Sequence, residues 1–190
     1  MIVVVAVVTF KRVNSLARLL ASCDKLAKPD DCRLIFLIVD NDRRESAGAV
    51  AWCPSAFDEL HYVCETKRGI PCALNRALDE AHLLGGHVLC FVDDDESPTE
   101  NWLRNIVSCW RHSNAQLVGG PVDVAPLPRD ADLPLRLINA SLVGRMARKS
   151  RKTAQAAKAG RPYTILTNNW LCDLHWQQRS GIRFDEKFLV

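Results

Sequence analysis

Apolar runs rich in β-branched residues alternate with segments of helical period along the first two-thirds of the chain, and this alternation restricts the possible folds most strongly. Residues 2–8 are continuously apolar, as expected for a strand that is covered on both faces. Residues 33–40 and 87–92 give further strand patterns, and residues 60–65 give a weaker one. Strands that alternate with helices favour a mainly parallel sheet, so we predict an α/β fold with helices on both faces of a central sheet.

Three segments between these runs have the apolar spacing of amphipathic helices. We expect one helix to start near Val13 and another to be opened by Pro71, because proline is favoured in the first turn of a helix. Before the third helix, Ser97 and Glu100 fit the spacing of a capping box. A fifth strand is predicted over residues 116–124.

The composition changes at Pro121, and the prolines that follow it indicate a linker or an irregular crossing. We therefore predict one α/β domain over residues 1–124 and an incomplete region over residues 125–190. Within the latter, residues 163–167 resemble a short strand and residues 170–179 a short helix.

A basic segment spans residues 145–161 and carries Arg145, Arg148, Lys149, Arg151, Lys152, Lys158 and Arg161. Three interpretations stay open: contact with an anionic membrane, a mobile loop that grips a diphosphate, or a solvated tract. We expect disorder somewhere within residues 147–160.

The overall composition excludes several classes of protein. A formal net charge of +3 is too small to indicate a nucleic-acid-binding protein. No apolar run approaches the roughly 20 residues that cross a bilayer, and the order of charges at the N-terminus does not fit a signal peptide. The eight cysteines lack Cys-x-x-Cys spacing, which favours free thiols in a reducing cytoplasm.

The strand pattern over residues 88–92 runs directly into Asp93, Asp94, Asp95 and Glu96. Ligands of parallel sheets bind beyond the carboxyl ends of the strands. Four consecutive acidic side chains there repel one another unless a cation neutralises them. Asp93 and Asp95 can both reach one hard divalent ion that also binds phosphates, so we predict a metal–diphosphate site. The alternative is a solvated acidic turn.

Two other strand ends carry polar residues. The second strand ends at Asp40, Asn41 and Asp42, which fit either contacts to a nucleobase or ribose, or an ordinary turn. The first strand ends in Thr9, Phe10, Lys11 and Arg12, without the glycines of a Rossmann dinucleotide site or a Walker loop. Thr9 and Arg12 can still meet a nucleotide.

Basic residues also precede the second helix. Lys67 and Arg68 lie just before Gly69, where a helix N-terminus with adjacent cations suits an anionic ligand. Asn75, one turn into this helix, can face the same cleft. For Lys67 a solvated surface position is an equally good interpretation.

Taken in order, these segments resemble the family 2 glycosyltransferases of GT-A fold. The segments that carry the resemblance are residues 7–12, 38–42, 69–78, 91–103, 119–122, 168–169 and 184–188. Each motif is loose, whereas the ordered set is more specific. The resemblance implies a GT-A-like sheet with a small acceptor-side lobe.

The resemblance also implies a nucleoside-diphosphate sugar as donor, a UDP-sugar first of all, and Mn²⁺ or Mg²⁺ as the ion. Asp93 and Asp95 are then the metal ligands. The residues implied in nucleotide binding are Thr9, Phe10, Arg12, Asp40, Asp42, Arg68, Asn75, Asp93 and Asp94. The acceptor would be a hydroxyl of a saccharide or of a lipid-linked molecule, and it would attack the sugar with inversion. The resemblance further implies a role in the synthesis of cell-envelope polysaccharide or glycolipid. The protein would act in the cytoplasm or peripherally at the inner face of the membrane.

The sequence departs from the family pattern near its end. The family's general base usually lies in a Glu-Asp pair shortly after the segment that resembles residues 184–188, and no such pair follows here. The chain therefore reads as C-terminally short, and Asp185 and Glu186 are weak candidates for the base. Two alternatives are a non-catalytic nucleotide-binding or interaction domain and a sugar nucleotidyltransferase, although the latter normally carries a glycine-rich loop after its first strand.

Overall fold

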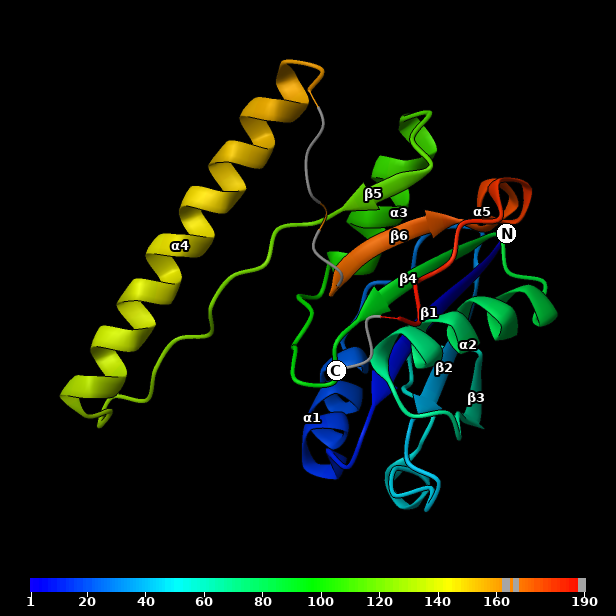
Figure 1. Ribbon diagram of the computed structural model, residues 1–190, viewed down its shortest axis with the longest axis horizontal. Helices are drawn as coiled ribbons and strands as arrows, with labels where there is room; N and C mark the ends of the chain where they lie inside the picture. The colour runs from blue at the N-terminus through cyan, green and yellow to red at the C-terminus, as the bar shows by residue number, and fades with distance from the viewer. Residues whose placement is uncertain (162–164, 166–167, 188–190) are drawn as a thin grey trace. The chain divides into compact units, whose positions relative to one another are not determined.

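The computed structural model describes residues 1–161, 165 and 168–187 (Figure 1). The chain divides into two compact units, which are described separately below. The first consists of Met1–Gly119 and Thr167–Val190, and the second of Gly120–Leu166. The strand expected over residues 163–167 lies, apart from Ile165, outside the described residues. No helix in the described part of the chain is long and apolar enough to cross a bilayer.

A six-stranded sheet of order β3-β2-β1-β4-β6-β5 forms the centre of the first unit. Four of its strands are parallel: β1 (Ile2–Thr9), β2 (Arg33–Asp40), β3 (Glu59–Cys64) and β4 (Val88–Val92). The predicted mainly parallel α/β sheet is therefore confirmed. Burial of β1, β2 and β4 on both faces explains why each reads as an apolar run.

The last two strands correct the sequence prediction. Residues predicted to start a helix at Trp170 instead form β6 (Asn169–Asp173), which pairs antiparallel with β4, and α5 (Leu174–Ser180) starts only after it. Pairing along the free edge of β4 outweighs the local helical pattern. The predicted strand over 116–124 shortens to β5 (Leu117–Gly119), because Pro121 has no amide proton with which to continue the ladder.

Helices cover both faces of the sheet, as predicted (Figure 1). The core on one face joins Val3, Val5 and Val7 of β1 to the apolar stripes of α1 (Val13–Cys23) and α3 (Trp102–His112). The other face is covered by α2 (Ile70–Leu83) and α5. A short 3₁₀ helix, η1 (Gly48–Val50), lies in the connection between β2 and β3.

The predicted capping box before α3 is wrong. The helix starts at Trp102 with Asn101 as its N-cap, and no side chain caps it. The residues before it form a loop in which the Trp102 amide donates to the Thr99 carbonyl at 2.9 Å and the Ala27 amide donates to the Glu100 carbonyl at 2.7 Å. The start of α3 is therefore fixed by backbone contacts to its surroundings.

The second unit contains α4 (Leu133–Lys158), which is capped by Asp132: its Oδ1 accepts from the Leu135 amide at 2.9 Å. This helix covers most of the stretch 147–160 in which disorder was expected. Alanine, arginine, lysine and glutamine dominate its second half, and these residues favour a helix. No residue of α4 is buried.

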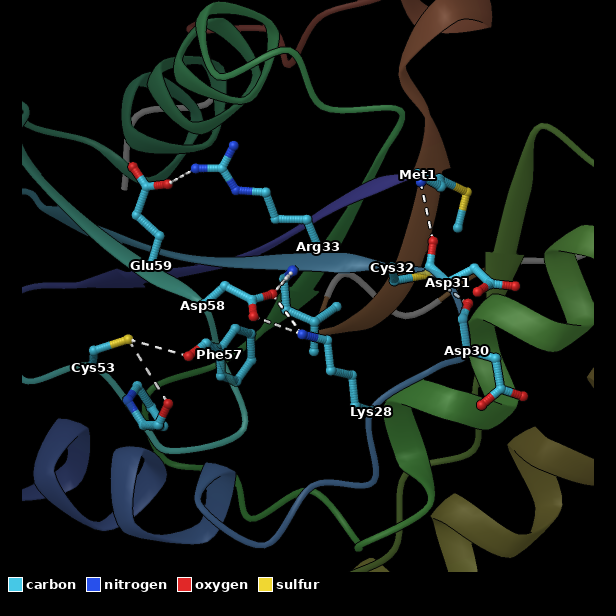
Figure 2. Close-up of polar contacts among 12 residues, drawn as sticks. Met1, Lys28, Asp30, Asp31, Cys32, Arg33, Cys53, Phe57, Asp58 and Glu59 are labelled. Carbon is cyan, nitrogen blue, oxygen red and sulfur yellow. Dashed lines mark hydrogen bonds and ion pairs between the residues drawn. The ribbon is translucent and has the colours of Figure 1, made fainter.

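Polar contacts tie together the amino ends of the strands. Figure 2 shows Lys28 beside the carboxylate of Asp58, whose two oxygens accept from Lys28 Nζ at 2.7 and 2.6 Å. The Leu34 amide also donates to Asp58 Oδ2 at 2.8 Å. The N-terminal amino group of Met1 donates to the Asp31 carbonyl at 3.1 Å. These contacts hold the segments that lead into β2 and β3.

Gly86, in the turn before β4, provides a test of the packing where Val4 of β1 meets α2 and α5. A Cβ atom at this position would lie 2.8 Å from the Ala81 carbonyl oxygen and 2.9 Å from Leu174 Cδ1. We therefore expect Gly86→Ala to lower the free energy of unfolding by about 1–3 kcal/mol, measured by urea denaturation. Gly144→Ala is the matched control, because nothing lies within 4 Å of its Cβ position and alanine favours the interior of α4. An unchanged urea midpoint for Gly86→Ala would contradict this account.

Candidate functional site

The carboxyl ends of the parallel strands bring the polar residues singled out by the sequence to one edge of the sheet. Thr9 at the end of β1 is aligned with Asp40 at the end of β2. β4 is in register with β1 from Val3 to Ala6, and Asp93 follows its last residue. Three chain segments that are far apart in sequence therefore end side by side, where α/β sheets bind ligands.

Asp94 is the central contact of this edge. Its Oδ2 accepts from the Thr9 hydroxyl at 2.7 Å, and its Oδ1 accepts from Arg12 Nη1 at 3.0 Å. The side chain is almost completely buried, with 4% of the residue exposed. Asp94 therefore joins the turn after β1 to the turn after β4, and its carboxylate is already neutralised inside the protein.

Asp93 and Asp95 flank this contact and are exposed. Arg12 Nη1 also donates to Asp95 Oδ2 at 3.0 Å. Loss of hydration, followed by repulsion from Asp95 and Asp94, raises the pKa of Asp93 above its ordinary value. Loss of hydration contributes most to this rise, and Asp95 and Asp94 add to it because the cluster concentrates negative charge that a bound cation would offset.

Glu96 completes the acidic cluster. Its carboxylate accepts from Asn168 Nδ2, and burial followed by repulsion from Asp93 raises the pKa of Glu96 to about 7. The β6 strand starts directly after Asn168, and Asn169 Oδ1 accepts from Trp102 Nε1 at 2.8 Å. The sequence did not single out Glu96 as a site residue, and the antiparallel placement of β6 beside β4 brings Asn168 to it.

Among the residues that the structure describes, no group of three or more His, Cys, Asp or Glu side chains is arranged to hold an ion by itself. The chemistry of the cluster nevertheless fits a hard divalent ion. Asp93 and Asp95 present exposed carboxylates, and Mg²⁺-type ions commonly bind one or two carboxylates with water and ligand phosphates completing the shell.

Asp40 has an internal position that the sequence did not indicate. It is 0% exposed, and its carboxylate accepts from the Asp42 amide at 3.0 Å, the Ala47 amide at 2.8 Å and the Tyr62 hydroxyl at 2.8 Å. Burial and this contact raise the pKa of Tyr62. These contacts fold the loop after β2, and the contact of Asp40 with a nucleoside stays a prediction.

Asn41, which the sequence placed in a turn that fits either a nucleoside contact or an ordinary turn, bonds the segment before α2. Its Nδ2 donates to the Glu65 carbonyl at 2.9 Å and the Lys67 carbonyl at 2.8 Å, and its Oδ1 accepts from the Gly69 amide at 2.9 Å. Asp42 beside it is also buried and accepts from the Arg44 amide at 3.3 Å. The sequence showed only a polar turn after a strand, because the residues that Asn41 bonds lie in the distant segment 65–69.

Phe10, Lys11 and Arg68 form an exposed group at the same edge. Phe10 is 37% exposed, and Lys11 Nζ and Arg68 Cζ lie 5.0 and 5.2 Å from the centroid of its ring. Lys11 adopts a φ of 57°, which is unusual for a residue other than glycine. An exposed aromatic ring with two cations near it combines apolar surface with positive charge.

Asn75 is buried in α2 and contacts the C-terminal segment. Its side chain exchanges hydrogen bonds with the backbone of Phe184 and also donates to Glu186 Oε1 at 3.2 Å. Asp185 and Glu186 were the two candidates for the general base. Glu186 forms an ion pair with Lys67, whereas Asp185 is exposed.

The predicted nucleotide and metal residues thus fall into two groups. The exposed group comprises Phe10, Arg12, Arg68, Asp93 and Asp95. The buried group, held by internal hydrogen bonds, comprises Thr9, Asp40, Asp42, Asn75 and Asp94. The first group can contact a ligand directly, and the second group shapes the edge of the sheet.

Comparison with known proteins agrees with this geometry. A family model described as Glycosyl transferase family 2 matches residues 4–172. The chain is 32% identical to the succinoglycan biosynthesis protein ExoM of Rhizobium meliloti over 120 residues, which cover 62% of this chain and 38% of that protein. It is also 32% identical to the glycosyltransferase AglE of Haloferax volcanii over 89 residues, 46% of this chain and 28% of that protein.

Solved structures show the same fold. The mannosyltransferase PcManGT from Pyrobaculum calidifontis, in complex with GDP-Man and Mn²⁺, superposes with a TM-score of 0.64 at 21% identity over 94% of this chain and 46% of its own. Staphylococcus aureus TarS 1–349 in complex with UDP gives 0.64 at 14% identity over 100% of this chain and 52% of its own. The matched region is thus about half or less of each relative. The family match covers most of the sequence, and on that ground the chain belongs to glycosyl transferase family 2.

Proposed function

We propose that this chain binds a nucleoside-diphosphate sugar together with Mn²⁺ or Mg²⁺ and transfers the sugar, with inversion, to a hydroxyl of a saccharide or lipid-linked acceptor. The proposal extends to synthesis of cell-envelope polysaccharide or glycolipid in the cytoplasm. The observation that carries it is the convergence of Thr9 and Arg12 from the end of β1 on the acidic cluster at the end of β4.

The metal would be held by Asp93 and Asp95, whose carboxylates are exposed. An ion shared with the donor would neutralise the charge that develops on the leaving diphosphate. Asp94 acts as a positioning residue, because its carboxylate fixes Arg12 beside Asp95. Arg12 would contribute positive charge toward the same phosphates.

Phe10, Lys11 and Arg68 provide the surface for the nucleotide. The exposed ring offers a stacking face, and the two cations suit an anionic ligand. The structural relatives bind UDP and GDP-Man, which supports a nucleotide donor and makes UDP and GDP the first ligands to test. On the acceptor side, Asp185 is the exposed carboxylate and is therefore the candidate base that we propose.

The first prediction concerns ligand and metal dependence. We expect one of UDP, GDP, CDP and TDP to raise the melting temperature of the protein in the presence of Mn²⁺, and EDTA to remove that shift. Stabilisation follows because a ligand that binds only the native state adds its binding free energy to folding. Thermal shift measurements with each diphosphate, with and without Mn²⁺, test this. Absence of a shift with all four would overturn the proposed function.

The second prediction assigns the metal ligands. Asp95→Asn and Asp93→Asn should each weaken Mn²⁺-dependent binding of that diphosphate by about tenfold or more, as measured by calorimetry, because an amide lacks the charge that a hard cation prefers. Asp31→Asn is the matched control, since Asp31 is exposed at the opposite end of the strands and has a φ of 55°, which asparagine tolerates (Figure 2). Equal affinities for all four proteins would remove these carboxylates from the metal site.

The third prediction concerns α4. Its exposed basic residues and exposed leucines suit an anionic bilayer, and we include such a peripheral contact in the proposal. We expect co-sedimentation with liposomes of anionic lipid that decreases as salt rises, and none with neutral liposomes. Failure to sediment with anionic liposomes at low salt would exclude the membrane contact while leaving donor binding untouched.

A further inference from the structure

The C-terminal segment 183–187 is bound along α2 by a set of specific contacts. Asn75 Oδ1 accepts from the Phe184 amide at 2.9 Å, and Asn75 Nδ2 donates to the Phe184 carbonyl at 3.0 Å. One buried amide side chain thus satisfies both backbone groups of a single residue. Such paired bonding fixes the segment in register with the helix, because both partners of Phe184 belong to the same side chain.

Two further contacts hold Phe184 and its neighbour. Arg183 binds both carboxylate oxygens of Asp79, at 2.7 and 2.8 Å. The Phe184 ring packs edge-on against Phe91 and Trp170, with ring centroids 6.4 and 6.0 Å apart. Phe91 is in β4, two residues before the acidic cluster, so the segment contacts both α2 and the strand that carries Asp93.

Glu186 extends these contacts to the loop before α2. Its carboxylate accepts from Asn75 Nδ2 and forms an ion pair with Lys67. The hydrogen bond from Lys67, followed by that from Asn75, lowers the pKa of Glu186. The hydrogen bond to Glu186 in turn raises the pKa of Lys67. The two charges therefore stabilise each other at neutral pH.

The loop formed by residues 65–69 is fixed from its other side by Asn41, which bonds the carbonyls of Glu65 and Lys67 and the amide of Gly69. Gly69 has a φ of 135°, a conformation that side chains rarely adopt. Arg68 lies between these anchors, with its guanidinium over the Phe10 ring. Its position thus depends on contacts made by both neighbouring residues.

We propose that residues 183–187 are a latch that holds loop 65–69, and with it Arg68, in the position required for the donor nucleotide. Lys67 and Glu186 are positioning residues in this arrangement. The expected effect of the latch on donor binding rests on the proposed function. Its expected effect on the mobility of loop 65–69 does not depend on any ligand. It links the acceptor-side end of the chain to the donor side of the site.

The competing interpretation is that Lys67 is itself a ligand of the diphosphate and that Glu186 masks it. The two interpretations predict opposite signs for one variant. If Glu186 positions the loop, Glu186→Gln weakens binding because the loop gains mobility. If Glu186 masks a ligand, Glu186→Gln frees the Lys67 cation and tightens binding.

The donor arm of the test measures the affinity of the diphosphate identified by thermal shift, in Mn²⁺, by calorimetry. We expect Glu186→Gln and Lys67→Gln each to weaken binding about threefold, the scale of one partly exposed ion pair. The double variant should be no weaker than either single variant, because both act through the same contact. Lys187→Gln, an exposed position on the same segment, is the control and should bind as the unmodified protein does. Tighter binding or unchanged binding by Glu186→Gln would overturn the latch.

The ligand-free arm follows hydrogen exchange of the Gly69 amide, which is bonded to Asn41 Oδ1. We expect faster exchange in Glu186→Gln than in Lys187→Gln or the unmodified protein, since loss of the ion pair loosens the loop. If the protein binds none of the diphosphates, the proposed function fails while this arm still decides the latch. Equal exchange rates in the three proteins would refute it.

Discussion

The parallel pairing of β1 with β2 and β4 is the constraint on which the rest of the structure depends. It places the ends of three strands at one edge, so Thr9, Asp40 and Asp93 approach one another although they are separated by many residues in sequence. These strands are buried on both faces, so close packing against the helices on either side holds them in place. The acidic cluster is therefore held by the core and not by its own loop.

Polar residues at this edge have two different roles that depend on burial. Asp40 and Asp94 are buried and use their carboxylates to bond neighbouring loops and strand ends. Buried carboxylates need such partners, since an unpaired charge away from water is strongly unfavourable. Asp93 and Asp95 keep exposed carboxylates and so can contact a ligand. The buried carboxylate of Asp94 holds Thr9 and Arg12, and through Arg12 it fixes the position of the exposed Asp95.

Much of the first unit was predictable because its signals are local. The apolar runs of β1, β2 and β4 and the stripes of α1 and α2 identify themselves by composition and period. The prediction failed where a segment takes its conformation from a neighbour. β6 is a strand because β4 offers a free edge, and the start of α3 is set by backbone contacts to Thr99 and Glu100 without a side-chain cap.

The sequence by itself determined the α/β class, the order of the main elements and the acidic cluster at the end of a buried strand, because each of these depends on residues close together in the chain. Only the tertiary structure decided which polar residues are exposed, that Asn41 anchors loop 65–69, and that Asn75 and Lys67 bind the C-terminal segment. These contacts join residues far apart in sequence, and a hydrogen bond forms only where folding brings donor and acceptor within about 3 Å of each other.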